Sequence, residues 1–142
     1  MNSEFQDCLK RKKIQEFSRG LALVEKELNT AKNDLNSAKE SLKNKNFKWA
    51  TIQSYYAMFH SARALLYIKN FREKSHYCLI VALKALYVDN KMLQPSLIES
   101  LQKAKILREN ADYYDDWSEN TAKSLIKAGE QFLETSKKLV AK

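Results

Sequence analysis

Hydrophobic residues recur three and four positions apart through most of the chain, and this is the spacing of one face of an α-helix. The pattern is clearest over residues 21–43, where it predicts a long helix that packs along a neighbouring helix. A second run of this kind follows Ser118, a favourable N-cap, and contains Gly129 in its interior. Because glycine costs a helix about 1 kcal/mol relative to alanine, we expect another helix to cross closely at Gly129.

Residues 47–69 are apolar on nearly every side, which predicts a central, buried helix. Three polar side chains interrupt this run, and at about 100° per residue they fall on one side of the helix. They are Gln53, His60 and Arg63. Polar groups on a buried helix need hydrogen-bond partners, so we expect these three to find them inside the fold or in another subunit.

Three shorter elements complete the predicted set of helices. We expect a short basic helix over residues 3–17. A helix over 76–88 follows Ser75, which is a plausible N-cap. A helix over 95–114 begins with Pro95, a residue that is favoured in the first turn.

Long helices joined by short turns pack as antiparallel neighbours. The chain holds 2 glycines and 1 proline, too few for the turns of a β-sandwich or an α/β fold, or for a glycine-rich phosphate loop. The sequence therefore predicts an all-α, up-down antiparallel bundle of five to six helices. We expect one domain over residues 1–142, with the basic N-terminal helix in residues 1–17 and the bundle in residues 18–141.

The net charge is +8 at pH 7, from 25 lysines and arginines against 17 aspartates and glutamates. The excess lies mostly in the first half of the chain, where it includes the run Lys10–Lys13. A basic surface attracts nucleic acid or an acidic partner. The same charge is equally consistent with a lysine-rich surface that only maintains solubility.

Neither the cysteines nor the longest uncharged stretch indicates an extracellular or membrane protein. Cys8 and Cys78 lie far apart and fit neither a zinc-site spacing nor a disulfide framework. Residues 49–62 carry no charge, but a membrane-spanning helix needs about 20 apolar residues. The N-terminus has no apolar signal segment. We therefore expect a cytoplasmic protein with reduced thiols and no membrane partner.

The first candidate site lies around the start of the helix predicted over 76–88. Arg72 and Lys74 would place positive charge beside the exposed N–H groups that follow Ser75, an arrangement that favours an anion. His76 can give or accept a proton near neutral pH. This chemistry suits phosphate binding, or a metal-free cleavage of RNA in which the 2′-hydroxyl attacks. The structural alternative is a surface turn in which His76 packs beside Ile80.

His60 and Arg63 form a second candidate site. The structural alternative is a buried pair whose polar groups are satisfied within the fold. Its partners would be Gln53, a tyrosine hydroxyl or the helix pair Arg108–Asp112.

The spacing of Glu73 and His76 matches the Glu-x-x-His motif of di-iron bundles. A di-iron site needs two such motifs, and the position that would supply the acid for His60 is occupied by Ala57. We therefore expect no bound metal ion and no cofactor.

Four segments together resemble the HEPN domain family. They are residues 55–66 (YYAMFHSARALL), residues 71–76 (FREKSH), residues 108–113 (RENADY) and the last helix with Phe132-Leu133. The resemblance spans roughly residues 18–140 and is closest to the small stand-alone prokaryotic members, of the kind paired with minimal nucleotidyltransferases. It implies an all-α up-down bundle that is usually a homodimer.

The resemblance also implies candidate site residues. Many HEPN proteins are metal-independent ribonucleases, and their signature is an arginine followed, after four to six residues, by a histidine. In this chain Arg72 and His76 match the signature with three residues between them, and they would be the catalytic pair. Asn70, Lys74 and Ser75 would be accessory contacts to RNA or a nucleotide.

Two functions are compatible with these features. The first is an RNA- or nucleotide-binding component of a toxin–antitoxin system with endoribonuclease activity, whose antitoxin is a minimal nucleotidyltransferase. The second is a non-catalytic helical adaptor that binds the nucleotidyltransferase. Because other HEPN proteins only bind nucleotides or partners, the resemblance leaves both open.

Overall fold

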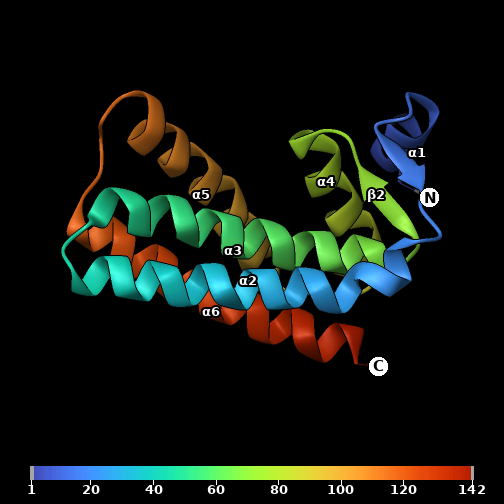
Figure 1. Ribbon diagram of the computed structural model, residues 1–142. Helices are drawn as coiled ribbons and strands as arrows, with labels where there is room; N and C mark the ends of the chain where they lie inside the picture. Colours follow the sequence, from blue (N-terminus) through green and yellow to red (C-terminus); the bar gives the residue numbers. More distant parts are fainter. Residues whose placement is uncertain (1, 142) are drawn as a thin grey trace.

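Three long helices lie side by side in a computed structural model that describes residues 2–141 (Figure 1). They are α2 (Gly20–Lys43), α3 (Phe47–Tyr67) and α6 (Glu119–Val140). α2 and α3 run antiparallel and are joined by a tight turn at residues 44–46, and α6 packs against both. The helical bundle predicted from the periodicity is confirmed.

Two more helices pack on α3 from the other side. α4 (His76–Leu83) continues directly into η1 (Lys84–Val88), a π-helical turn, and together they span the helix predicted over 76–88. α5 (Pro95–Tyr113) begins at Pro95, so the predicted position of the proline in the first turn is confirmed.

α3 is the central helix, as its sequence predicts, and most of its residues are buried. Small residues such as Ala50 and Ala57 share a core with Leu35 of α2, while larger ones such as Met58 and Leu65 share a second core with α4 and α5. Although α3 is so apolar, no helix within residues 2–141 has both the length and the hydropathy to cross a membrane.

Both glycines lie where two helices touch. A Cβ atom on Gly129 would lie 3.2 Å from Cδ1 of Leu35 and 3.8 Å from the carbonyl oxygen of Ser54, so the predicted close crossing is confirmed. Gly20 lies against the last turn of α3, where a Cβ atom would be 3.0 Å from the carbonyl oxygen of Tyr67 and 3.1 Å from its Cα.

The helix predicted over residues 3–17 is wrong beyond residue 10. α1 (Ser3–Lys10) ends there, the chain turns through Lys12 with a φ of 58°, and β1 (Ile14–Glu16) follows. β1 pairs antiparallel with β2 (Phe71–Glu73). A strand of this length is too short for its pattern to be recognised, and its hydrogen bonds depend on a partner far along the chain.

A disulfide joins Cys8 of α1 to Cys78 of α4, which corrects the expectation of reduced thiols. The two cysteines are 70 residues apart, and the packing of α1 on α4 brings them together. The chain-entropy model assigns about 4 kcal/mol to closing a loop of this length. α1 is therefore attached to the bundle covalently as well as by packing.

Alanine substitutions at the two glycines are expected to change stability differently. Gly20→Ala places a methyl group against the backbone of Tyr67, which cannot move aside, so we expect a loss of about 1–3 kcal/mol in the free energy of unfolding. Gly129→Ala is the matched control, because its methyl group meets the end of the Leu35 side chain and about 1 kcal/mol of helix propensity offsets the displacement. Urea unfolding measures both values. Equal losses at the two positions would contradict this account of the two contacts.

Candidate functional site

β2 leads into α4, so Arg72 and His76 lie on adjoining elements. Oγ of Ser75 accepts a hydrogen bond from the backbone N–H of Cys78 (3.1 Å) and caps α4, as the sequence predicts. His76 is the first residue of α4 and is partly buried. Its Nδ1 lies 3.5 Å from the hydroxyl oxygen of Tyr55 on α3, and its buried Nε2 has no hydrogen-bond partner within residues 2–141. The imidazole therefore lies against the body of the bundle.

A pocket of about 270 Å³ lies beside His76. Two lysines line it, Lys84 after α4 and Lys105 on α5, together with Asn2 and Glu4 from the start of the chain. The first turn of a helix favours anions, and the two ammonium groups add positive charge. The pocket therefore has features that suit a phosphate group.

Burial lowers the pKa of His76 to about 4. The positive charges of Lys105 and Arg108 act in the same direction, while Glu109 opposes them. His76 is therefore neutral at pH 7, and a neutral imidazole is able to accept a proton.

The side chain of Arg72 packs along β1. Its Nε and Nη2 both donate to Oε1 of Gln15, at 3.3 and 3.1 Å, and Gln15 lies directly opposite in the strand pair. Its guanidinium group also lies 5.2 Å from the ring centre of Phe17. The structure thus brings the predicted catalytic pair onto adjoining elements but gives the two side chains different partners.

The three predicted accessory residues all shape the β2 segment. Asn70 has a φ of 66°, a left-handed conformation that asparagine tolerates, and its carbonyl oxygen accepts from the N–H of Phe17 (2.6 Å). The backbone N–H of Lys74 donates to the carbonyl oxygen of Lys13 (2.8 Å). Asn70 and Lys74 have exposed side chains, whereas the hydroxyl of Ser75 is used in the helix cap.

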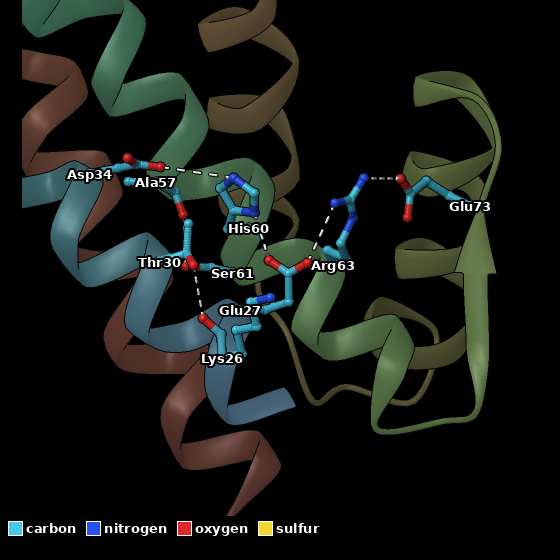
Figure 2. Close-up of polar contacts among 9 residues, drawn as sticks. All are labelled: Lys26, Glu27, Thr30, Asp34, Ala57, His60, Ser61, Arg63 and Glu73. Carbon is cyan, nitrogen blue, oxygen red and sulfur yellow. Dashed lines mark hydrogen bonds and ion pairs between the residues drawn. The ribbon is translucent and has the colours of Figure 1, made fainter. Parts of the chain in front are cut away.

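His60 and Arg63, the second candidate, contact acidic side chains inside the fold (Figure 2). Nδ1 of His60 lies 2.6 Å from a carboxylate oxygen of Glu27, and Nε2 lies 3.9 Å from one of Asp34. Arg63 reaches the second oxygen of Glu27 (3.4 Å) and a carboxylate oxygen of Glu73 (3.0 Å). The prediction that these polar residues find partners inside the fold is confirmed.

The identity of those partners corrects the sequence analysis. Gln53, a tyrosine hydroxyl and the pair Arg108–Asp112 are the predicted partners, and these are wrong. Gln53 is hydrogen-bonded to Ser41 instead (2.8 Å), and Arg108 and Asp112 pair with each other (3.5 Å). The true partners come from α2 and β2, and only the packing of these elements on α3 brings their acids within reach.

The ion pairs of this second site connect α2, α3 and β2. Burial raises the pKa of Glu27, but the hydrogen bonds and charges of His60 and Arg63 outweigh burial, so the pKa lies below its ordinary value. The bond from Arg63 holds Glu73 on the α3 side of β2. Because successive side chains alternate along a strand, Arg72 lies on the opposite face. The second site therefore has a structural role that sets the direction of Arg72.

Arg108 on α5 belongs to the surroundings of His76, and sequence reasoning missed it. Its guanidinium carbon lies 5.3 and 5.5 Å from the ring centres of Tyr55 and Tyr56, and 5.9 Å from that of Tyr113. Tyr55 is the residue whose hydroxyl approaches His76. The segment RENADY is recognisable in the sequence, but only the fold shows that its arginine lies near the histidine.

Within residues 2–141, no group of three histidine, cysteine, aspartate or glutamate side chains has an arrangement that would hold a metal ion. The Glu-x-x-His spacing of Glu73 and His76 does not make a shared site. Glu73 binds Arg63, while His76 lies against Tyr55.

The family model described as the HEPN domain matches residues 24–139, which include α3, β2, α4 and α5. The chain belongs to the HEPN domain family. The match begins after α1 and β1, so the disulfide-linked helix and the strand that holds Arg72 precede the region shared with this family model.

Two relatives of this HEPN protein come from Methanocaldococcus jannaschii. One, named "Putative toxin MJ0605", is 35% identical over 109 residues, which are 76% of this chain and 81% of the relative. The other, named "Putative toxin MJ0142", is 27% identical over 117 residues, which are 81% of this chain and 80% of the relative. In both cases the similarity includes most of each chain.

The environment of His76 predicts an imidazole that titrates at unusually low pH. The pKa is about 4 in the folded protein against an ordinary value of 6.5, so the unfolded chain binds the proton first as the pH falls. The contribution of His76 to stability is therefore complete above pH 6.5 and is lost as the pH falls toward 4. We expect NMR titration of the imidazole signals to show this midpoint. Lys105→Gln should raise it, because a nearby positive charge is removed.

Lys127→Gln, on the exposed side of α6, is the matched control and should leave the His76 midpoint unchanged. His76→Gln assigns the signal, since the chain has 2 histidines. A wild-type midpoint near 6.5 would show that the imidazole is solvated and would contradict its placement against Tyr55.

Proposed function

We propose that this protein is the RNA-binding, toxin-type member of a two-component system and that it cleaves RNA without a metal ion. The observation that carries the proposal is His76, a neutral imidazole beside a pocket that Lys84 and Lys105 make positive. Because the imidazole is unprotonated at pH 7, it can take the proton of a 2′-hydroxyl in the transition state, while the cations attract the RNA phosphates. The HEPN family and the names of the two relatives support the toxin assignment.

In the proposed reaction, the 2′-hydroxyl of the RNA attacks the adjacent phosphate. His76 takes the proton of that hydroxyl, the 2′-oxygen forms a bond to phosphorus, and the bond from phosphorus to the 5′-oxygen breaks. Arg72 breaks its hydrogen bonds to Gln15 and binds the phosphate, and its charge stabilises the pentacovalent transition state. Water supplies the proton to the leaving 5′-oxygen. The products carry a 2′,3′-cyclic phosphate and a 5′-hydroxyl, and the exposed Asn70 and Lys74 contact neighbouring nucleotides.

We propose further that the protein acts as a homodimer and that a minimal nucleotidyltransferase is its antitoxin. Within one chain Arg72 and His76 have different partners, so a second copy offers a way to bring an arginine to a phosphate held at His76. Large hydrophobic side chains on α3, α5 and the following loop are exposed and would suit protein interfaces. They include Tyr56, Tyr113 and Trp117.

The second candidate function is a non-catalytic adaptor that binds the nucleotidyltransferase. The observation that favours it is the side chain of Arg72, whose guanidinium group is already occupied by Gln15 and lies over the ring of Phe17. An adaptor needs neither an available arginine nor a proton acceptor.

Replacing Arg72 or His76 by alanine is expected to reduce RNA cleavage by about 10²–10⁴-fold, which is typical of losing a general base or a group that stabilises the transition state. The assay uses end-labelled RNA with a chelator present, and mass spectrometry identifies the cyclic phosphate. Sedimentation of the same samples should give about twice 16.5 kDa for the wild type and both variants.

Arg19→Ala is the matched control for Arg72→Ala. Arg19 also lies over the ring of Phe17 (6.0 Å), but it is outside β2 and should be dispensable for cleavage. If the purified wild-type dimer leaves RNA intact both with the Cys8–Cys78 disulfide formed and after its reduction, and both alanine variants bind the nucleotidyltransferase as the wild type does, the adaptor function replaces the ribonuclease.

The run Lys10–Lys13 is exposed and borders the β1–β2 pair. If it binds RNA phosphates, affinity should fall steeply with salt, and replacing all four residues by glutamine should reduce the slope of log K against log salt by about 0.7 for each phosphate that is no longer neutralised. The control replaces four exposed lysines elsewhere, Lys103, Lys123, Lys127 and Lys138. A slope that is the same for both variants and the wild type would assign the run to solubility.

A further inference from the structure

Residues 2–17, here called the N-terminal segment, precede the region that the HEPN family model matches. They include α1 and β1, whose main contacts outside the segment are with α4 and β2 (Figure 1). These are the elements that carry His76 and Arg72. The segment therefore lies against the candidate site from one side.

The β1 end of this segment holds Arg72. Gln15 accepts hydrogen bonds from both Nε and Nη2 of the guanidinium group, and the ring centre of Phe17 lies 5.2 Å from its carbon atom. A phosphate that binds the same Nε–Nη2 edge of the guanidinium group competes with Gln15 for Arg72.

The α1 end of the segment forms a wall of the pocket beside His76. Asn2 and Glu4 line that pocket, and the carboxylate of Glu4 accepts a hydrogen bond from the hydroxyl of Tyr77 (2.7 Å). Glu4 also adds a negative charge to the lining of a pocket whose lysines favour an anion. An RNA phosphate would be repelled by that carboxylate while α1 stays in place.

The disulfide between Cys8 and Cys78 fixes this position. Cys78 is two residues after His76, and both cysteines are almost completely buried, at 1% and 0% exposed. The other contacts of α1 are weaker ones, such as the edge-to-face packing of Phe5 on Phe71. Without the covalent bond, an eight-residue helix and a three-residue strand would hold the segment.

We propose that the N-terminal segment is a redox-controlled cover of the Arg72–His76 surface, closed when Cys8 and Cys78 are joined and opened when they are reduced. The inference rests on the proposed function only for what the uncovered surface then does to RNA. The proposal gives this disulfide the transient, redox-sensing role that disulfides usually have in a reducing compartment.

The opening reaction is a thiol–disulfide exchange with a dithiol reductant. A thiolate of the dithiol attacks one cysteine sulfur, the bond between Cys8 and Cys78 breaks, and a mixed disulfide forms. The second thiol of the reductant then displaces the remaining protein thiol, so the dithiol loses two electrons and the protein gains two thiols. A disulfide oxidant reverses the exchange. Since both sulfurs are buried, the attack requires the end of α1 to fray first.

The test uses the full chain in two states, oxidised with oxidised glutathione, or reduced with dithiothreitol and desalted without oxygen. Diethyl pyrocarbonate, which modifies neutral imidazole nitrogens, reports the accessibility of His76 by peptide mass spectrometry. Trypsin cleavage after Lys10–Lys13 reports the release of the segment. We expect the rate of His76 modification and the rate of trypsin cleavage to rise several-fold on reduction. His60, which lies against Glu27 and Asp34, is the internal reference and should not change.

Cys8→Ser extends the test, because Cys8 lies on the movable side while Cys78 belongs to α4. This variant should behave like the reduced wild type with or without oxidant, whereas Ser3→Ala, on the exposed side of α1, should follow the wild type. The wild-type comparison needs no substitution, so it remains decisive even if Cys8→Ser folds poorly.

Equal reactivity of His76 in the two wild-type states would overturn the proposal. So would a parallel rise at His60, since this would mean that reduction loosens the whole bundle. RNA cleavage measured on the same samples separates the two ideas. If the reactivity of His76 changes on reduction but neither state cleaves RNA, the ribonuclease is rejected and the cover is kept. If RNA is cleaved but the reactivity of His76 is the same in both states, the cover is rejected and the ribonuclease is kept.

Discussion

The burial of α3 is the constraint on which the other helices depend. A helix that is apolar on nearly every side must be covered on every side. Small residues let α2 and α6 approach one part of its surface closely, and larger residues fill the space toward α4 and α5. Its buried serine hydroxyls bond to the helix itself, since Ser54 and Ser61 donate to the carbonyl oxygens of Ala50 and Ala57 (2.7 and 2.9 Å). The up-down arrangement follows from covering one helix.

The few polar residues of α3 then position the candidate site. Arg63 holds Glu73 toward the bundle, which turns the neighbouring Arg72 to the other face of β2. Tyr55 lies beside His76, and the burial of that imidazole keeps it neutral. The same helix that organises the core therefore sets both the direction of the arginine and the protonation state of the histidine.

Local patterns in the sequence predict the five later helices, whereas the N-terminal helix is shorter than predicted and gives way to β1. Ser75, Pro95 and Ser118 begin helices as predicted, because caps and first turns depend on residues only a few positions apart. The β1–β2 pair, the disulfide and the acids that bind His60 could not be predicted, because each joins segments distant in the chain. For the candidate site, the sequence supplies the residue types, whereas the burial of His76 and its cationic neighbours come from the fold.

The effect of the short spacing between Arg72 and His76 depends on the strand and the helix that carry these two residues. Arg72 is in a strand, where the side-chain direction alternates, and it faces away from its neighbour Glu73. His76 comes after an extended residue, Ser75, starts a helix and lies against Tyr55 of α3. The spacing therefore determines the directions of the two side chains as well as their separation. A ligand that binds the Nε–Nη2 edge of Arg72 and also reaches His76 has to displace Gln15, so the segment that supplies Gln15 takes part in deciding whether the pair acts together.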